Sequence, residues 1–281
     1  MAAVILIHAA GVERFFVPEA GASIRPLHFH GRRRILAAMT HRPTTLITGS
    51  ARRIGAAIAR HLAARGHHLV LHYHRSRTET EALAAELRGH GTPVTLVEAN
   101  LAEPAALAGF WEGLPPCTTI IHNAARYTRD TMETFTAADL RAHLAINLEA
   151  PLLLTQGFLN QLPAGATGNV LVLGDDALGW SASPALFSYA VSKHGWRAVI
   201  DLLAAACAPR VRANLIALAP TLPSDNDPEG MFERLTERAP LRRTGTVAEV
   251  LAAIDFLLGS EGITGQTIGL GNGMALATAR P

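Results

Sequence analysis

The most informative stretch of this sequence is Leu46-Ile47-Thr48-Gly49-Ser50-Ala51-Arg52-Arg53-Ile54-Gly55. A short apolar run enters a turn at Gly49, and from Ile54 to Leu62 apolar residues recur at the spacing of one helix face. The stretch therefore predicts a strand, a glycine turn and the start of a helix. Unpaired N–H groups and the positive end of the helix dipole favour a phosphate at such a start. The spacing differs from G-x-G-x-x-G, so an ordinary strand–helix connection is the alternative.

Length and composition indicate one α/β domain with an attached segment. The chain has 281 residues, of which 49% are hydrophobic and 17% charged, and these values are typical of a folded globule. A net charge of +2 without any long basic run gives no support for nucleic-acid binding. Cys117 and Cys207 are too few and too isolated for a disulfide framework or a metal site, and they fit a reducing compartment. We therefore expect a cytoplasmic protein without a metal, a nucleic-acid partner or a membrane contact.

The first 42 residues differ from the rest, because they show neither strand–helix alternation nor a sustained amphipathic period. The apolar run 2–7 is too short to span a bilayer and follows no charged segment, so a secretory signal is not expected. Met39 lies just before the first predicted strand and is a possible true start. We interpret residues 1–42 as a disordered arm or a mis-assigned start, with a packed arm and a targeting segment as alternatives. Residues 43–281 are interpreted as a single domain.

From residue 43 onward, short apolar runs alternate with helical periodicity. Strands are predicted at residues 45–47, 68–73, 94–97, 118–121, 170–173, 211–217 and 267–270, and helices at 53–65, 78–87, 104–114, 137–161, 188–206 and 246–258. Such alternation produces right-handed crossovers and a parallel sheet covered on both faces. The predicted fold is therefore α/β, a three-layer doubly wound Rossmann fold with a seven-stranded parallel sheet. Ligands of such sheets bind outside the carboxyl ends of the strands.

The end of the second of these strands indicates which dinucleotide is bound. Many dinucleotide sites have an acidic residue there for the ribose 2′-OH, whereas this chain has His72, His74, Arg75 and Ser76. A guanidinium binds a 2′-phosphate bidentately, and Arg53 in the first turn can join it. The predicted cofactor is NADPH, and a solvated basic loop is the alternative.

The fourth predicted strand ends in Asn123-Ala124-Ala125-Arg126-Tyr127. The two small residues after Asn123 let a backbone lie flat against a ribose or a nicotinamide. Tyr127 can project an aromatic face over the same pocket, and a core or surface tyrosine is the alternative interpretation.

The chemical centre is predicted around Tyr189 and Lys193, which lie one helical turn apart on one face. A lysine near a tyrosine favours the phenolate and lowers the pKa of the phenol, which makes it a usable proton donor near neutral pH. The spacing Y-x-x-x-K is common by chance. It gains weight because Asp176 lies thirteen residues upstream, just past the fifth strand, and Asn147 lies inside the long helix before that strand.

These motifs together resemble the short-chain dehydrogenase/reductase family over about residues 43–275. Within that family, Arg52-Arg53-Ile54-Gly55, the run 72–76 and an acid thirteen residues before the tyrosine are similar to pteridine reductases and bacterial dihydromonapterin reductases. Most of the family has a serine at the position of Asp176, and its hydroxyl donates to a carbonyl oxygen. A carboxylate there would repel a developing alkoxide and fits better a C=N bond whose nitrogen gains a proton.

The resemblance implies roles for individual residues. Tyr189 would be the proton donor, Asp176 would assist it, and Lys193 would hold the nicotinamide ribose. Asn147 would anchor a water-linked proton path. The implied cofactor-binding residues are Gly49, Arg52, Arg53, Ile54, Gly55, His72, His74, Arg75, Ser76, Asn100, Leu101, Asn123, Ala124, Ala125, Tyr189, Lys193, Pro220 and Leu222. The implied substrate-binding residues are Arg53, Tyr127, Asp176, Tyr189 and Leu222, with a pterin stacked between the nicotinamide and Tyr127.

Three positions depart from the family pattern. The serine or glycine that usually follows Asn-Ala is Ala125, the acid often found near the adenine is Asn100, and the usual Asp-Gly-Gly near the C-terminus reads Gly271-Asn272-Gly273. The hypothesis from sequence is a homotetrameric, NADPH-dependent reductase of a C=N bond in a dihydropterin. A carbonyl reductase of the same family and a non-catalytic NADPH-binding sensor are the alternatives.

Overall fold

The structure is a computed structural model that describes residues 5–9, 12–16, 42–175, 185–224 and 226–274. The chain divides into two compact units, residues 1–42 and 43–281. In the first unit, strands β1 (Ile5–Ala9) and β2 (Val12–Phe16) pair antiparallel, with Ile5 opposite Phe16. The sequence analysis did not anticipate this pair of strands.

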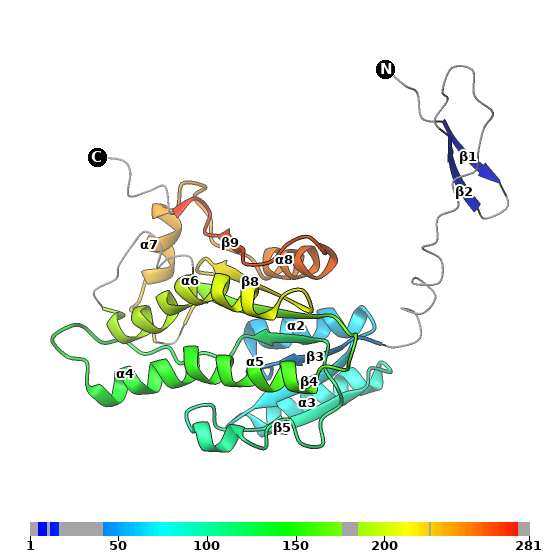
Figure 1. Cartoon of the computed structure of the whole chain (residues 1–281). Coiled ribbons are helices and arrows are strands. Elements are labelled where there is room, and N and C mark those ends of the chain that lie inside the picture. Colours follow the sequence, from blue (N-terminus) through cyan, green and yellow to red (C-terminus); the bar gives the residue numbers. More distant parts are fainter. Residues whose placement is uncertain (1–4, 10–11, 17–41, 176–184, 225, 275–281) are drawn as a thin grey trace. The chain divides into compact units, whose positions relative to one another are not determined.

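The second unit is built on a seven-stranded sheet in which all neighbouring strands run parallel (Figure 1). Its strand order is β5-β4-β3-β6-β7-β8-β9. The strands are β3 (Thr44–Ile47), β4 (His68–Tyr73), β5 (Val94–Glu98), β6 (Thr119–His122), β7 (Gly168–Asp175), β8 (Val211–Leu218) and β9 (Thr267–Leu270). The predicted α/β Rossmann fold with a seven-stranded parallel sheet is confirmed.

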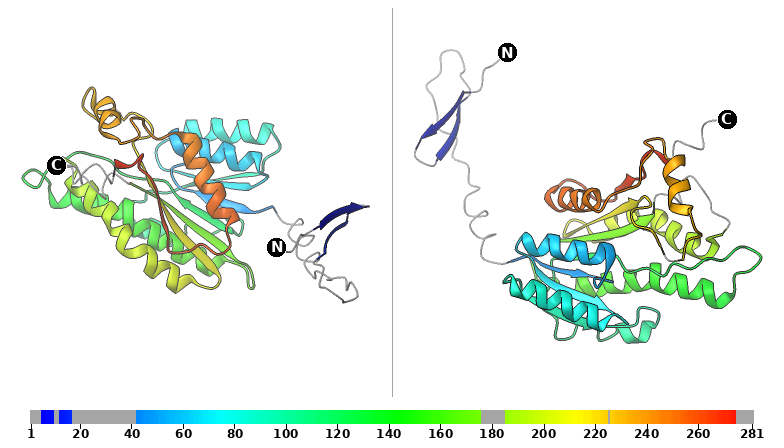
Figure 2. Two further views of the ribbon diagram at one scale, coloured as in Figure 1. Left: turned by 90° about the horizontal axis from the view of Figure 1, so that it is seen from above. Right: turned by 180° about the vertical axis from the view of Figure 1, so that it is seen from behind.

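Helices cover both faces of this sheet (Figures 1 and 2). They are α2 (Arg53–Ala64), α3 (Arg77–Gly89), α4 (Ala137–Leu144), α5 (Ala150–Gln161), α6 (Phe187–Cys207), α7 (Met231–Arg238) and α8 (Val247–Gly259). Adjacent strand residues point to opposite faces. Leu46 and Ile120 accordingly pack in one core cluster with residues of α5 and α6, whereas Ile47 and Ile121 pack in the other with residues of α2, α3 and α8. Two apolar layers therefore hold the strands, which explains their continuous apolar sequences.

The strand order reverses between β3 and β6, because the chain leaves β3 toward β4 and β5 and later returns to β6 on the other side. The crevice outside the carboxyl ends of strands at such a reversal is where ligands of open parallel sheets bind. The segments that follow β3, β4, β6, β7 and β8 are therefore the ones that can form a site.

Several predicted element boundaries were wrong. Residues 104–114 form only a short 3-10 helix, η1 (Pro104–Leu107), followed by turns that end at Gly113. Gly113 has a φ of +71°, and a longer helix cannot continue through that conformation. Strand β7 extends to Asp175 rather than ending at residue 173. Helix α7 was not predicted.

The long helix predicted at 137–161 is interrupted by a π-helical turn, η2 (Ala145–Glu149). Pro151 has no N–H, so it cannot bond to the carbonyl of Asn147 four residues earlier. The indole Nε1 of Trp196 in α6 donates to that carbonyl instead, at 2.7 Å. The interruption therefore ties the helix to α6 beneath the predicted chemical centre.

No helix within the described parts of the chain is both long and apolar enough to cross a membrane. Among the same residues, no cluster of three or more histidine, cysteine or acidic side chains is arranged to hold a metal ion.

Candidate active site

The glycine turn after β3 is held in place from the end of β6. Thr48 Oγ1 accepts hydrogen bonds from the backbone N–H groups of Asn123 and Ala124, both at 3.0 Å. The side-chain amide Nδ2 of Asn123 donates to the backbone carbonyls of Thr48 and Gly49 at 3.0 and 2.9 Å. Gly49 has a φ of +62°, and a Cβ there would lie 2.9 Å from the Cα of Ala124. A Cβ on Gly55 would lie 2.3 Å from the carbonyl oxygen of Gly49, so both glycines are needed for this turn.

A cleft of about 620 Å³ opens beside this turn. It is lined by Gly49, Ala51, Arg52, Arg53, Ile54, Gly55, Tyr73, His74, Arg75, Ser76, Asn100, Ala102, Asn123, Ala124, Ala125, Arg126 and Ile146. The N-cap residue of α2, Arg52, makes no capping hydrogen bond with its side chain, and the first turn of the helix contains no acidic residue. The open N–H groups of that turn and the nearby guanidinium groups form a site that fits an anion.

Two residues predicted to bind the cofactor lie in the interior instead. His72 is buried; its Nδ1 accepts from the backbone N–H of Gly49 at 3.2 Å, and its Nε2 lies 3.1 Å from the carbonyl of Ala99. Burial lowers the pKa of His72 to about 4, so the ring is neutral and supports the turn rather than binding a phosphate. Leu101 belongs to the core cluster that contains residues of α5, and it does not line the cleft.

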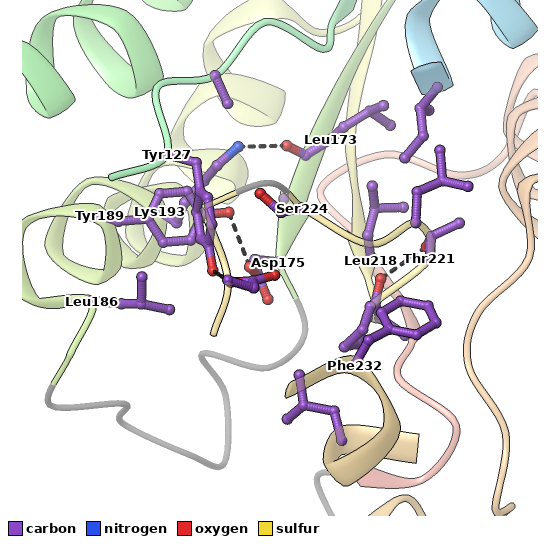
Figure 3. A pocket seen from close by; sticks show the side chains of 18 of the residues that line it. Tyr127, Leu173, Asp175, Leu186, Tyr189, Lys193, Leu218, Thr221, Ser224 and Phe232 are labelled. Atoms are coloured by element: carbon purple, nitrogen blue, oxygen red, sulfur yellow. Dashed lines mark hydrogen bonds between the residues drawn. The ribbon is translucent and has the colours of Figure 1, made fainter. Parts of the chain in front are cut away.

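A second pocket, of about 490 Å³, contains the predicted chemical centre (Figure 3). The ends of β6, β7 and β8 and the helices α6 and α7 form its walls. Its lining consists of Arg53, Ile54, Asn123, Ala125, Tyr127, Leu173, Gly174, Asp175, Leu186, Tyr189, Lys193, Leu218, Ala219, Pro220, Thr221, Leu222, Ser224, Asp227, Met231, Phe232, Leu235 and Arg238. Arg53 lines both cavities, and its Nη2 donates to the carbonyl of Leu222 at 3.2 Å, so it connects the turn to the loop after β8.

The reactive pair lies at the floor of this pocket. The phenol of Tyr189 donates to Asp175 Oδ2 at 2.9 Å, and Lys193 Nζ donates to the carbonyl of Leu173 at 3.0 Å. Lys193 Nζ lies 6.0 Å from the centre of the Tyr189 ring. Both side chains are buried, and burial lowers the pKa of Lys193 to about 8.

The pKa of Tyr189 differs from the sequence-based expectation. Burial, followed by the charge and hydrogen bond of Asp175, raises it well above its ordinary value, whereas the motif predicted that Lys193 would lower it. Burial is the main cause, and the contacts add to it, because the Lys193 ammonium group bonds to a carbonyl whereas the Asp175 carboxylate bonds to the phenol. Tyr189 is therefore a neutral hydrogen-bond donor over the whole physiological pH range.

Asp175 was not predicted as a site residue, and Asp176, which was, lies outside the described residues. A signal for Asp175 was present in the sequence. It lies two residues after Leu173, so a strand extended by two residues points both side chains to the same face. The prediction ended the strand at residue 173 and therefore missed this alternation.

Asn147 is fully engaged in supporting the loop after β6. Its Oδ1 accepts from the backbone N–H of Arg126 at 2.7 Å, and its Nδ2 donates to the Arg126 carbonyl at 3.0 Å and to Ser192 Oγ at 2.9 Å. Its side chain is buried, and Asn147 lines neither cavity. A link from this residue to a proton path stays a prediction.

Tyr127 lies beside Tyr189, with the two rings edge to face and their centroids 4.9 Å apart. Its hydroxyl donates to Asp227 Oδ1 at 2.5 Å. Burial and the hydrogen bond to this carboxylate raise the pKa of Tyr127. The sequence analysis assigned no role to Asp227, and it missed the apolar wall that Met231, Phe232 and Leu235 of α7 contribute.

The parallel sheet, the glycine turn with its anion site and the Tyr189–Lys193 pair are features of a Rossmann-type oxidoreductase. The chain belongs to the short-chain dehydrogenase/reductase family, because the family model described as enoyl-(acyl carrier protein) reductase matches residues 49–275.

Individual relatives differ in the substrates that their names give. FolM alternative dihydrofolate reductase 1 from Brucella canis, whose crystal structure contains NADP, has 32% sequence identity and a TM-score of 0.78, with 85% of this chain and 96% of that chain covered. Dihydromonapterin reductase from Enterobacter sp. strain 638 is 27% identical, with 82% of this chain and 96% of the relative covered. The 3-oxoacyl-[acyl-carrier-protein] reductase from Synechocystis sp. is 29% identical with the same coverage.

Proposed function

We propose that this protein is an NADPH-dependent reductase of a C=N bond in a dihydropterin. One observation carries the proposal: the proton donor Tyr189 is hydrogen-bonded to a carboxylate, Asp175, inside the pocket. A reduced ketone passes through developing negative charge on oxygen, which a carboxylate at this distance would destabilise. In the reduction of a C=N bond the ring nitrogen gains a proton, and the negative charge of the carboxylate favours this protonation. Relatives named for dihydrofolate and dihydromonapterin support this choice.

The cofactor assignment rests on the fit of the first cleft. The uncapped start of α2 and the glycine turn suit a pyrophosphate, and Arg75 and Ser76 after β4 suit a 2′-phosphate. Among the described residues that line the cleft none is acidic, so none of them favours a free 2′-hydroxyl. Lys193, which lines the second pocket, would hold the nicotinamide ribose. Bound NADPH would supply the hydride.

The proposed chemistry needs one hydride on the carbon and one proton on the nitrogen of the C=N bond. Tyr189, which is protonated near neutral pH, gives the proton. Asp175 holds the phenol in position and favours its reprotonation from solvent after transfer. Tyr127 offers an aromatic face beside the phenol ring of Tyr189. The sequence analysis assigned this assisting role to Asp176, the next residue in the chain, and not to Asp175.

A carbonyl reductase is the second candidate, and the apolar wall of the pocket favours it. Met231, Phe232 and Leu235 of α7 could accommodate an acyl chain, and a 3-oxoacyl reductase is among the relatives. A sensor that binds NADPH without turnover is the third candidate. The buried Tyr189–Lys193 pair opposes it, because a binding protein has no need of a desolvated proton donor.

One assay separates these candidates. NADPH oxidation by the purified protein is measured against dihydromonapterin, dihydrobiopterin and dihydrofolate, and against ketones and 3-oxoacyl thioesters. The proposal expects kcat/KM to be highest for a dihydropterin. Preferential turnover of the thioester would favour the second candidate, and tight NADPH binding without any oxidation would favour the sensor.

We also propose that the protein assembles as a homotetramer. The support is an exposed apolar stripe on α6, where Val191 is 41% and Leu202 70% exposed, with Leu153 of α5 at 38%. Light scattering should give the mass of four chains, and Leu202→Glu should reduce that mass.

A further inference from the structure

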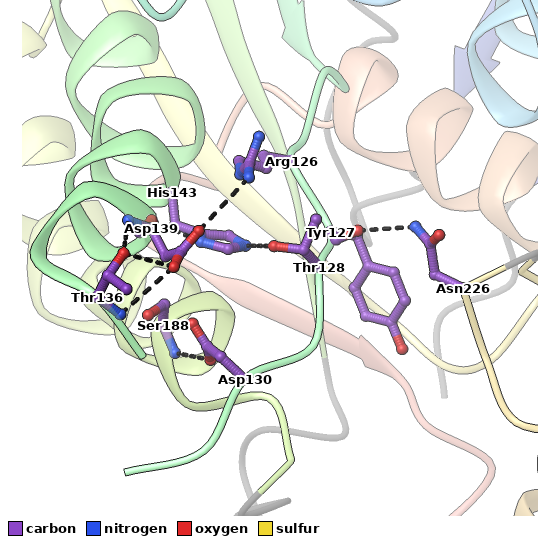
Figure 4. Close-up of polar contacts among 9 residues, drawn as sticks. All are labelled: Arg126, Tyr127, Thr128, Asp130, Thr136, Asp139, His143, Ser188 and Asn226. Atoms are coloured by element: carbon purple, nitrogen blue, oxygen red, sulfur yellow. Dashed lines mark hydrogen bonds and ion pairs between the residues drawn. The ribbon is translucent and has the colours of Figure 1, made fainter. Parts of the chain in front are cut away.

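Tyr127 belongs to a segment that the helices hold firmly (Figure 4). Thr128 Oγ1 is hydrogen-bonded to the buried His143 of α4 at 3.1 Å. Asp130 Oδ1 accepts from the backbone N–H of Ser188 at 2.8 Å, at the start of α6. The backbone of residue 126 is held by Asn147, as described above. Segment 126–130 is therefore attached at three points, to α4, to η2 and to α6, and α6 is the helix that carries the reactive pair.

The loop between β8 and α7, whose described residues are 219–224 and 226–230, attaches to this segment from the other side of the pocket. Asp227 accepts the hydroxyl hydrogen of Tyr127 and lies 3.5 Å from the guanidinium of Arg129. The Asn226 amide donates to the backbone carbonyl of Tyr127 at 2.9 Å (Figure 4). The Asp227 and Arg129 side chains are only 19% and 25% exposed, so water screens their charges less than at an open surface.

We propose that Asp227 is a positioning residue of this site. By accepting the Tyr127 hydrogen bond it fastens the β8–α7 loop over the pocket and fixes the aromatic ring that lies against Tyr189. The loop also carries Leu222, Pro220 and the residues leading to the apolar wall of α7, so the same contact sets the width of the pocket. The inference rests on the proposed function, since it takes the substrate to be a flat ring held against Tyr127.

Four variants test the inference. Asp227→Ala removes the acceptor, Asp227→Asn keeps an oxygen acceptor without the charge, and Tyr127→Phe keeps the ring without the donor. Glu229→Gln is the matched control, because this exposed acid lies on the same loop and does not line the pocket. KM and kcat are measured for the substrate that the parent reduces best. Hydrogen–deuterium exchange of segment 126–130 and of the loop is measured without substrate.

Loss of a hydrogen bond to a charged group corresponds to roughly tenfold or more in affinity. Asp227→Ala and Tyr127→Phe should each raise KM about tenfold, change kcat less than about threefold, and combine without additivity because they remove the same contact. Exchange should rise in the loop, Asp227→Asn should lie between Asp227→Ala and the parent because it keeps the acceptor but loses the charge, and Glu229→Gln should stay near the parent. Unchanged KM in both single variants, or additive effects in the double variant, would overturn the positioning role.

The substrate preference of the parent protein tests the proposed function independently of the Asp227 variants. If the parent reduces a ketone or thioester but no dihydropterin, the pterin proposal fails. The positioning role is then judged by the same KM cycle on the substrate that is turned over. A rise in exchange without any rise in KM for that substrate would also overturn the positioning role, because it would show the contact to be structural only.

Discussion

Two phenol–carboxylate pairs lie next to each other in the pocket. Tyr189 donates to Asp175 and Tyr127 donates to Asp227, and the two rings meet edge to face. Such a pocket presents several acceptor oxygens at close range. It suits a substrate that brings N–H donors and gains a proton, and it is unfavourable for one that develops an oxyanion.

At the same scale, Arg75 is expected to select NADPH over NADH. Replacing Arg75 with Ala should raise KM for NADPH and remove roughly tenfold to a hundredfold of the discrimination, because a charge-assisted hydrogen bond contributes about 1.5–3 kcal/mol. Steady-state kinetics with both cofactors provide the measurement. Arg77→Ala is the control, since Arg77 pairs with Glu98 and does not line the cleft. Equal kcat/KM for the two cofactors in the parent would contradict the assignment.

At the scale of elements, the ends of β4 and β6 use buried histidines to support the site. His72 holds the glycine turn, and His122 at the end of β6 is hydrogen-bonded to Thr155 of α5 at 2.9 Å and stacks on Trp196. Burial lowers the pKa of His122 to about 3. Both rings must be neutral in the folded chain, which makes these strand ends sensitive to acid.

We predict that His122→Phe reduces this acid sensitivity. The folded-state pKa lies below the unfolded value, so the unfolded state binds more protons between about pH 3 and 6.5 and stability falls as the pH falls through that window. Between pH 6.5 and 5 one such group contributes up to about 2 kcal/mol to the loss. Urea unfolding at the two pH values should show a smaller loss in the variant than in the parent. The exposed His90→Gln serves as control, and equal losses in parent and His122→Phe would refute the prediction.

Local patterns predicted the elements better than the details of the site. The alternation of apolar runs and helical periods suffices for the parallel sheet, because buried strands need continuous apolar sequence. Which side chains reach the cavity depends on packing. His72 and Leu101 follow the motif spacing yet lie inside, and Asp175 reaches Tyr189 because β7 continues two residues further than its apolar run. The interruption at Asn147 arises from Pro151 together with Trp196 on another helix. Pro151 can be read from the sequence, whereas the contact of Trp196 with the Asn147 carbonyl is known only from the structure.

At the scale of the whole molecule, both cavities lie within the second unit, residues 43–281. A chain that begins at Met39 is therefore expected to fold and to retain its turnover. Thermal unfolding and NADPH oxidation of this shortened chain, beside the full chain, provide the measurement. A shortened chain that is folded but inactive would show that residues before position 39 take part in the activity.

In the proposed mechanism, the phenol of Tyr189 protonates a ring nitrogen with the assistance of a carboxylate. The most direct test is single-turnover NADPH oxidation with a dihydropterin at saturating NADPH, in the parent, Asp175→Ser and Asp176→Ser. Loss of assistance to general-acid transfer typically costs about 10²–10⁴ in rate. We predict a fall of at least about tenfold for Asp175→Ser with an unchanged Kd for NADPH, and a smaller fall for Asp176→Ser. An unchanged rate in Asp175→Ser would contradict the claim.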